Sequence, residues 1–324
     1  MRRREFITAL GAAVAWPLAA RAQDKKYVIG ILETISAELN AANLDALRRG
    51  LRELAYTDGQ NMRLEYRSAD GQAARFPGLA AELVRLKVDL IVTRGTPAAL
   101  AAKEATSTIP IVMAAIGDPL DTGVVASLGR PGGNVTGFSA FVTELAGKRV
   151  ELMKEVVPSV GRVGYCNDMS NPVAPPQWEE TQKAARSLAI QTELLDVRSK
   201  EDIPRAFERA AQQGVDGLLV GPDAITQQHR GMIANLAERQ QLPTIYAARE
   251  YVEAGGLMSY GVSYPDLYRR AAGMVDKIFK GASPGDLPVE QPAKFELVIN
   301  GKTTKAISLE IPPVVLARAD EVIE

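Results

Sequence analysis

Along this chain, short runs of apolar residues alternate with longer stretches in which apolar residues recur at every third or fourth position. The runs lie at 27–32, 62–66, 89–93, 109–114 and 135–138 in the first half, and at 162–166, 191–196, 217–220, 243–246 and 256–260 in the second. Nearly all are short and apolar on both faces, which is typical of parallel strands covered by helices on both sides. The alternation therefore predicts doubly wound α/β units with right-handed crossovers.

The same order of elements occurs twice. Residues 88–112 and 215–245 each begin with Val-Asp and a short apolar run, continue through a turn with Gly and Pro and a helical stretch, and end in a second apolar run that a proline opens. The strands at 27–32 and 162–166 extend this similarity upstream. Two similar halves indicate two lobes that face each other across a cleft, an arrangement that favours ligand capture over catalysis.

The turn-rich segments place the boundaries of these lobes. Gly and Pro cluster at 129–134, 255–261 and 281–292. We expect lobe 1 to comprise residues 23–139 with about 260–290, and lobe 2 to comprise 140–259 with about 291–324, although the lobe of the C-terminal segment is left open. Three crossings would form a hinge that restricts the lobes to bending.

The first 22 residues have the pattern of an export signal. Arg2–Arg4 form a basic start, residues 6–20 are mostly apolar, and Ala20-Arg21-Ala22 offers small residues at the cleavage positions. The sequence Arg3-Arg4-Glu5-Phe6-Ile7 also fits the twin-arginine pattern, and a general secretory signal with an extra arginine is the alternative. We expect a mature N-terminus at Gln23 and a periplasmic protein.

The composition excludes several classes of partner. The chain has 324 residues, of which 46% are hydrophobic, and its formal net charge is −1. This is enough for two cores, but it lacks the basic surface that nucleic acids or an anionic membrane require. We expect no nucleic-acid partner, no stable membrane insertion and a monomer. Cys166 is the only cysteine, so an intrachain disulfide is excluded.

The residues that usually perform catalysis are scarce. The only histidine, His229, lies in a polar stretch predicted to be a helix surface, and Cys166 ends a strand that we expect to be buried. The sequence contains no HExxH, CxxC, EF-hand or GxSxG motif. We therefore predict no enzyme, no cofactor and no metal.

Candidate binding residues follow the strands, because ligands of open α/β sheets lie beyond the carboxyl ends of the strands. Thr96 is predicted to start a helix with Pro97 at its first turn, where free backbone N–H groups could hold a carboxylate, although simple capping is the alternative. Asp118 is either a turn residue or the partner of a ligand ammonium group. Acidic, amide, basic and aromatic side chains around one cleft would suit a small zwitterion with an apolar side chain. The candidates are Thr34, Gly95, Thr96, Pro97, Ala98, Asp118, Asn167, Asp223, Tyr246 and Arg249.

Several longer motifs resemble one family. They are K-V-D-L-I-V-T with G-T-P-A-A (87–99), D-P (118–119), V-A-S-L-G-R-P-G-G-N-V-T-G-F (125–138), L-A-G-K-R (145–149), V-E-A-G-G-L-M-S-Y-G (252–261), L-P-V-E-Q-P-A-K-F-E-L-V-I-N (287–300) and A-R-A-D-E-V-I-E (317–324). From about residue 27 to 324 the chain is similar to the ABC-transporter substrate-binding proteins related to tryptophan and tyrosine uptake.

The resemblance implies a type I periplasmic-binding-protein fold and delivery of a solute to an inner-membrane permease with its ATPase. It also implies ligand contacts at Thr34, at Gly95–Ala98 and at Asp118 in lobe 1. In lobe 2 it implies contacts at Asn167, Asp223, Tyr246 and Arg249. Members often show a serine-threonine pair where this chain has Glu33-Thr34, so a carboxylate stands beside the expected cleft.

Three functions are consistent with these patterns. The first is an exported receptor of an ABC importer that closes over a small ligand, an amino acid or related carboxylate. The second is a periplasmic ligand sensor that presents its closed lobes to a signalling receptor. The third is an exported hydrolase that would use Asp118 and Asp223 as acid and base, provided that burial held one of them neutral.

Overall fold

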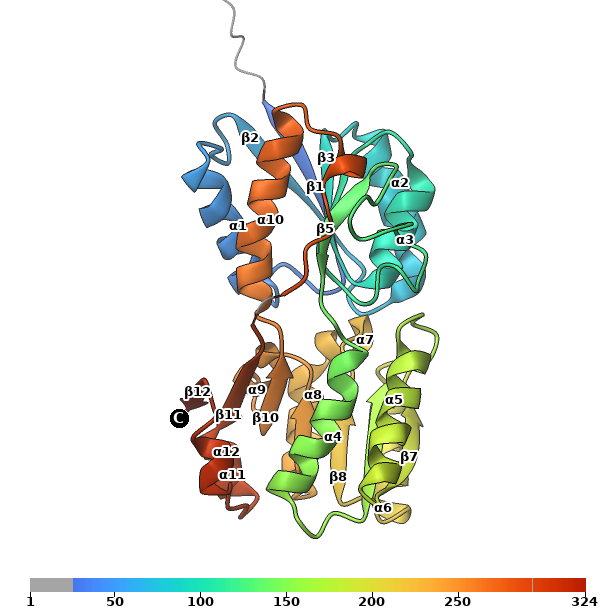
Figure 1. Cartoon of the computed structure of the whole chain (residues 1–324), viewed down its shortest axis with the longest axis vertical. Coiled ribbons are helices and arrows are strands. Elements are labelled where there is room, and N and C mark those ends of the chain that lie inside the picture. The colour runs from blue at the N-terminus through green and yellow to red at the C-terminus, as the bar shows by residue number, and fades with distance from the viewer. Residues whose placement is uncertain (1–25, 293) are drawn as a thin grey trace, which may run out of the picture.

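The computed structural model describes residues 26–292 and 294–324, which form two α/β lobes (Figure 1). The expected signal at residues 1–22 and the expected N-terminus at Gln23 lie outside the described residues. In the described part of the chain, no helix has both the length and the apolar character that crossing a bilayer requires.

Lobe 1 is built on a five-stranded parallel sheet in the order β2-β1-β3-β4-β5. Every residue of its strands β3 and β4 is buried, as expected for strands covered on both faces. The strands are β1 (Tyr27–Glu33), β2 (Met62–Ser68), β3 (Leu90–Arg94), β4 (Ile111–Ile116) and β5 (Val135–Ser139).

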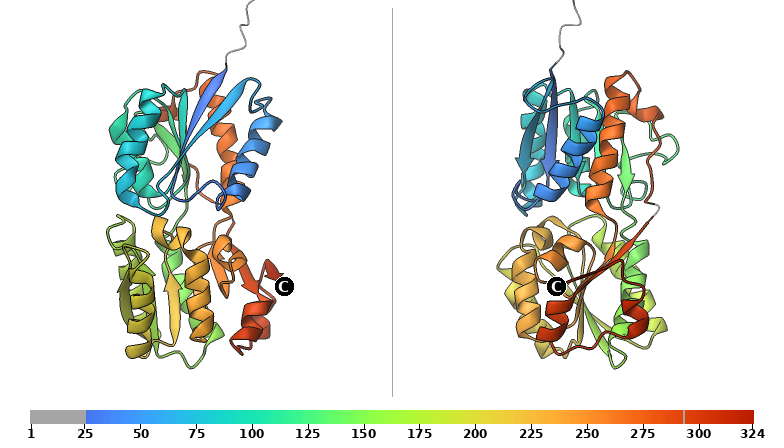
Figure 2. Two further views of the ribbon diagram at one scale, coloured as in Figure 1. Left: turned by 180° about the vertical axis from the view of Figure 1, so that it is seen from behind. Right: turned by 90° about the vertical axis from the view of Figure 1, so that its left-hand side faces the viewer.

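Two pairs of helices cover this sheet, one pair on each face (Figures 1 and 2). Helices α2 (Phe76–Arg85) and α3 (Thr96–Ala105) pack on one face, and α1 (Ala41–Glu53) and α10 (Tyr264–Phe279) on the other. Helix α10 thus belongs to lobe 1, although it follows the main strands of lobe 2 in the sequence. Short 3-10 turns at Ala73–Arg75 and Pro284–Asp286 complete the lobe.

Lobe 2 contains a seven-stranded sheet in the order β12-β11-β10-β9-β8-β6-β7. All neighbouring strands are parallel except β10 and β11, which are antiparallel. The strands are β6 (Arg162–Asn167), β7 (Gln191–Asp196), β8 (Gly217–Val220), β9 (Thr244–Tyr246), β10 (Met258–Gly261), β11 (Glu296–Asn300) and β12 (Glu321–Ile323).

The helices of lobe 2 also lie on both faces of its sheet (Figure 2). Helices α4 and α5 pack together, as do α6 and α8 on the other side. The helices are α4 (Glu144–Val156), α5 (Ala174–Ser187), α6 (Asp202–Gln212), α7 (Ala224–Gln228), α8 (Arg230–Arg239), α9 (Arg249–Glu253), α11 (Gly301–Ala306) and α12 (Pro313–Leu316). The predicted α/β class with two lobes is confirmed.

The chain passes between the two sheets three times. It leaves lobe 1 after β5, returns between β10 and α10, and leaves again after residue 290, where the Glu290 backbone pairs with β5. The expected crossing at 255–261 lies slightly later, since 258–261 form strand β10. The C-terminal segment, whose lobe the sequence left open, joins the lobe 2 sheet through β11 and β12.

Candidate functional site

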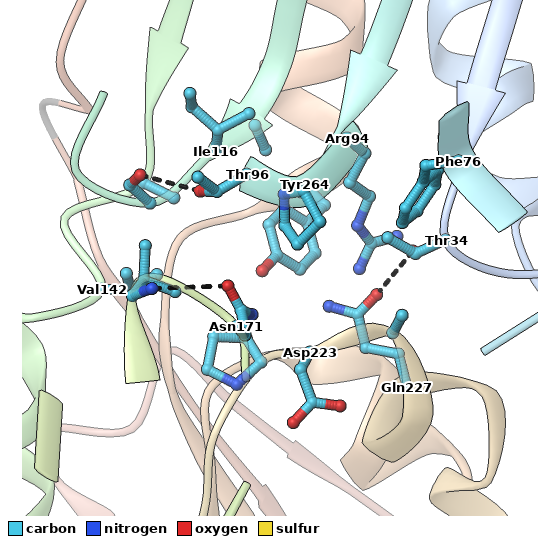
Figure 3. A pocket seen from close by; sticks show the side chains of 18 residues that line it. Thr34, Phe76, Arg94, Thr96, Ile116, Val142, Asn171, Asp223, Gln227 and Tyr264 are labelled. Atoms are coloured by element: carbon cyan, nitrogen blue, oxygen red, sulfur yellow. Dashed lines mark hydrogen bonds between the residues drawn. The ribbon is translucent and has the colours of Figure 1, made fainter. Parts of the chain in front are cut away.

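A cavity lies between the lobes, where the carboxyl ends of the strands of both sheets meet (Figure 3). Lobe 1 and the connections between the lobes contribute most of the lining. The lining residues are Thr34, Phe76, Arg94, Gly95, Thr96, Pro97, Ala115, Ile116, Gly117, Ala140, Val142, Asn171, Val173, Pro222, Asp223, Ala224, Gln227 and Tyr264.

The corner between β3 and α3 forms the floor of the cavity in lobe 1. Gly95 has a φ of 85° and a ψ of 139°, a region that only glycine adopts without strain. A Cβ atom there would also lie 2.9 Å from the Cγ2 of Thr34. Thr96 Oγ1 donates a hydrogen bond to the Gly117 carbonyl (2.9 Å), which ties the helix start to β4. Pro97 has no N–H group and the Ala99 N–H donates to the Gly95 carbonyl (3.1 Å), so Thr96 and Ala98 carry the N–H groups of the first turn of α3 that have no intrahelical acceptor.

On the opposite wall, Asp223 caps helix α7. Its Oδ1 accepts a hydrogen bond from the Thr226 N–H and its Oδ2 accepts one from the Asp168 N–H, both at 2.8 Å. The residue is 4% exposed. Burial raises the pKa of Asp223 to about 7, against the two backbone N–H groups, which lower it. Lobe 2 thus contributes a buried carboxyl group that can be neutral or charged near neutral pH.

Arg94 brings a positive charge to the lobe 1 side. Its guanidinium lies 4.0 Å above the ring of Tyr264, and its Nη2 is 3.3 Å from Oε1 of Glu250 in lobe 2. Burial acts to lower the pKa of Arg94, but Glu250 and neighbouring groups raise it further, so the side chain stays charged. The wall of the cavity therefore includes a cationic group of lobe 1 and a titratable carboxyl residue of lobe 2.

The two lobes are in direct contact around the cavity. The Thr34 hydroxyl donates to Gln227 Oε1 (3.1 Å), and the Ser36 N–H donates to Gln228 Oε1 (3.4 Å). Arg230 donates to the Leu39 carbonyl (3.0 Å). These contacts connect the loop after β1 to helices α7 and α8, so this arrangement of the lobes is a closed one.

Five of the ten candidate residues lie on the cavity wall. These five follow β1, β3 and β8, and they are Thr34, Gly95, Thr96, Pro97 and Asp223. Ala98 is buried in the first turn of α3, directly behind them. The strand ends that the sequence indicated therefore do meet at one place.

The structure places the other four candidates elsewhere. Asp118 accepts a hydrogen bond from the Thr143 hydroxyl at the crossing between the lobes, and burial raises its pKa to about 6. Asn167 is buried beneath the cavity, where its Nδ2 donates to the Tyr165 hydroxyl (2.7 Å). Because Asp118 and Asp223 do not share the cavity wall, the structure gives no support to an acid–base pair.

Tyr246 and Arg249 lie away from the cavity, and we leave them out of the site. Tyr246 points into the core of lobe 2 and stacks on Tyr251, with ring centroids 5.0 Å apart. Arg249 lies on the outer side of lobe 2, where it forms ion pairs with Glu253 (2.8 Å) and Glu321 (2.7 Å). The sequence located the correct strand end but not the direction of these side chains.

Glu33 does not present its carboxylate to the cavity. The side chain is fully buried in lobe 1, where it accepts hydrogen bonds from the Tyr268 hydroxyl and the Thr34 N–H. Burial raises its pKa, while the nearby charge of Arg94 lowers it. Glu33, the residue that differs from the family pattern, therefore interacts with Arg94 inside lobe 1 and does not line the cavity.

Sequence reasoning missed several residues of the cavity wall, namely Phe76, Arg94, Asn171, Gln227 and Tyr264. For Arg94 a signal was present, because a charged residue ends an otherwise apolar strand, and such residues are rarely buried without a specific role. Phe76 and Tyr264 each open a helix in front of a proline. The sequence does not reveal that these two helix starts face the same cavity.

Taken together, two lobes, a three-segment hinge and a cavity at the strand ends define a two-lobed binding protein of the type I periplasmic class. The model of the family described as "ABC transporter substrate binding protein" matches residues 28–323. The chain belongs to this family, whose members are binding proteins that work with an ABC transporter.

Three relatives illustrate the similarity. The "Tyrosine-binding protein" of Clostridioides difficile (strain R20291) is 28% identical over 280 residues, covering 85% of this chain and 80% of that protein. The structure of an "ABC domain in complex with L-Trp" from Streptococcus pneumonia is 30% identical and has a TM-score of 0.84, covering 92% of this chain and all of that one.

The third relative is a ligand-free, open substrate binding protein from Clostridium difficile. It is 26% identical, covers 92% of this chain and 99% of its own, and has a TM-score of 0.64. The identities of the two solved structures are similar, yet the L-Trp complex superimposes much better. The lobes of this protein are therefore arranged more like those of the ligand-bound relative, in agreement with the contacts between them.

Proposed function

We propose that this protein captures an α-amino acid between its lobes and delivers it to an ABC permease. The observation that carries the proposal is the charge distribution of the cavity. Lobe 1 offers the N-terminus of α3 with Arg94 nearby, and lobe 2 places Asp223 on the opposite wall, with its carboxyl group held by the Thr226 and Asp168 N–H groups. A zwitterion is the small ligand that satisfies both sides at once.

Each part of such a ligand has a partner. The ligand carboxylate would accept hydrogen bonds from the N–H groups of Thr96 and Ala98 at the start of α3, where the helix dipole also favours a negative charge. The ammonium group would donate to the Asp223 carboxylate, as a charge-assisted hydrogen bond. Phe76, Ile116 and Val173 offer apolar surface to the side chain.

The names of the relatives support an aromatic amino acid. One relative is called a tyrosine-binding protein and another was solved with L-Trp. Direct contacts between the lobes at Gln227, Gln228 and Arg230 flank the cavity. Entry therefore requires the lobes to separate, and closing over the ligand would displace the direct contacts around Gln227.

The cellular setting follows from the same proposal. Residues 1–22 would direct export, by the twin-arginine or the general secretory route, and the mature protein would work as a monomer in the periplasm. Its partner would be an inner-membrane ABC permease with its ATPase, which accepts the closed form.

The test is a thermal-shift and calorimetry panel of L-tyrosine, L-tryptophan, L-phenylalanine and L-leucine. A ligand at 100 times its Kd adds about 2.7 kcal/mol to the free energy of unfolding, so the melting temperature should rise clearly. Tyramine, which lacks the carboxylate, and N-acetyl-tyrosine, which lacks the ammonium group, are the matched controls and should bind far more weakly. Equal binding of L-tyrosine and N-acetyl-tyrosine would contradict the proposed role of Asp223.

A further inference from the structure

Glu250 of lobe 2 inserts its carboxylate into lobe 1. The residue lies in the first turn of α9 and is 8% exposed. Its Oε1 accepts hydrogen bonds from Asn43 Nδ2 (3.1 Å) and from Arg94 Nη2 (3.3 Å). Both donors belong to lobe 1, so a buried charge of one lobe is satisfied by the other.

Lobe 1 holds the receiving groups in place by itself. Asn40 Oδ1 accepts hydrogen bonds from Asn43 Nδ2 (2.9 Å) and from Arg94 Nη1 (3.4 Å), and the ring of Tyr264 lies under the guanidinium. We call Asn40, Asn43 and Arg94 the Arg94 socket. Its members come from the start of α1 and the end of β3, and all are at most 2% exposed.

Glu33 gives Arg94 a second acidic neighbour, and this one belongs to lobe 1 itself. It is buried in lobe 1 close enough to interact electrostatically with Arg94, and Tyr268 fixes its carboxyl group. Arg94 would therefore retain a nearby acidic group in the open form. In the closed form Glu250 adds the carboxylate that contacts the guanidinium directly.

We propose that Glu250 is a positioning residue for closure, whose docking into the Arg94 socket holds lobe 2 over the bound ligand. Glu250 is not part of the cavity wall, whereas Arg94 is, so the socket transmits closure to the ligand site without a contact between Glu250 and the ligand. Removing one partner of a buried, hydrogen-bonded charge pair is costly because the other charge stays buried without its partner. The ligand used in the test rests on the proposed function, while the role of Glu250 in closure does not.

The decisive comparison is between Glu250→Gln and Glu253→Gln. Both residues lie on α9, but Glu253 pairs with Arg249 inside lobe 2. We expect Glu250→Gln to raise the Kd for L-tyrosine by about tenfold or more, through faster release at an unchanged association rate. The Kd of Glu253→Gln should stay within about twofold of the original protein. Equal Kd values for the two variants would overturn the proposal.

A double-mutant cycle separates positioning from a general loss of structure. Asn43→Ala removes the second donor to Glu250 from the lobe 1 side. The double variant should raise the Kd by clearly less than the product of the two single-variant increases, since both substitutions act on one contact. A fully multiplicative effect on Kd would overturn the proposal.

A measurement without ligand distinguishes this proposal from the proposed function. If L-tyrosine does not bind the original protein, the proposed function fails in its aromatic form, and small-angle scattering of the ligand-free proteins then decides the role of Glu250. A larger radius of gyration for Glu250→Gln than for Glu253→Gln would support the socket, and equal radii would overturn it.

Discussion

The two lobes share one pattern of strands and helices but contribute opposite chemistry to the cleft. Lobe 1 supplies backbone N–H groups at the start of α3 and the guanidinium of Arg94. Lobe 2 supplies the carboxyl groups of Asp223 and Glu250. The N–H groups of α3 are fixed within lobe 1 by the Gly95 corner, and Asp223 is fixed within lobe 2 by its cap of α7, whereas Glu250 is held by donors of lobe 1.

The difference shows how two lobes of the same fold can bind opposite ends of one ligand. A ligand with one charge would be attracted to one lobe alone, whereas a zwitterion gains contacts from both only when the lobes close. Closure therefore depends on the differential affinity of the ligand for the closed form. The contrast between the lobes leads to four predictions.

The largest effect is expected from removing the lobe 2 charge. Asp223→Asn keeps an oxygen that can cap α7 but loses the partner of the ligand ammonium group, so the affinity for the amino acid should fall by about 2–4 kcal/mol. Asp168→Asn is the matched control, because Asp168 does not line the cavity and its carboxylate accepts hydrogen bonds from Ser170. Calorimetry should find the control close to the original protein. An unchanged Kd for Asp223→Asn would remove lobe 2 from ligand recognition.

The part of the binding site in lobe 1 can be disrupted at Gly95, in the corner between β3 and α3. Gly95→Ala should lower the free energy of unfolding by about 1–3 kcal/mol and weaken ligand binding, because the backbone there suits only glycine and a Cβ would collide with Thr34. Gly123→Ala is the control, since Gly123 also has a positive φ, 72°, but open space around a Cβ within the described structure. Denaturant unfolding should show the smaller loss for Gly123→Ala.

Both the ligand affinity and the stability of the protein should depend on pH through Asp223 of lobe 2. An ammonium group needs the ionised form of Asp223, whose pKa is raised by burial to about 7. Ligand affinity should therefore fall by about tenfold between pH 8 and pH 6. The stability of the ligand-free protein should change in the opposite direction. The pKa of Asp223 is higher in the folded protein than its ordinary value of 3.8. Its contribution to the free energy of unfolding is therefore complete below pH 3.8 and is lost as the pH rises through about 7.

Asp118, with a pKa raised by burial to about 6, should contribute to stability in the same direction. The Asp223→Asn variant should lose most of the pH dependence of ligand affinity between pH 6 and 8. Calorimetric titrations across this range, in parallel with thermal unfolding, measure both trends. An affinity that is constant over the range in the original protein would contradict the assignment of the ammonium group to Asp223.

The smallest effect is expected at the outer side of lobe 2. Arg249→Gln should change the Kd for the amino acid by less than twofold and the stability by less than about 1 kcal/mol, because the side chain forms partly exposed ion pairs with Glu253 and Glu321. A tenfold loss of affinity would show that the binding surface of lobe 2 extends beyond the cavity.

Much of the fold could be predicted from the sequence, because parallel strands leave a clear local signal. The ten apolar runs all coincide with strands, and the carboxyl ends of β1, β3 and β8 led directly to Thr34, Gly95 and Asp223. These positions depend on the topology of one sheet at a time. The lobe of the C-terminal segment, which contains the antiparallel β11, was not predicted, since the pairing of β11 with β10 is a long-range choice.

The rest of the site depends on geometry that local patterns do not contain. Tyr246 ends strand β9, and side chains alternate between the two faces of a sheet, so the pattern located the strand end but not the side to which Tyr246 points. The pairing of Arg94 with Glu250 joins residues 156 positions apart and depends on the angle between the lobes. A sequence shows such charges singly and does not show which of them meet.

Helix α10 has a consequence for how the chain is made. It packs along α1, with Gly50 so near the Arg269 carbonyl that a Cβ would approach it to 2.5 Å. Because α10 is synthesised after β6–β10, the first lobe cannot finish assembling until most of the second has left the ribosome. A nascent chain interrupted at the second crossing would leave the side of α1 that α10 covers, around Gly50, open to water and to proteases.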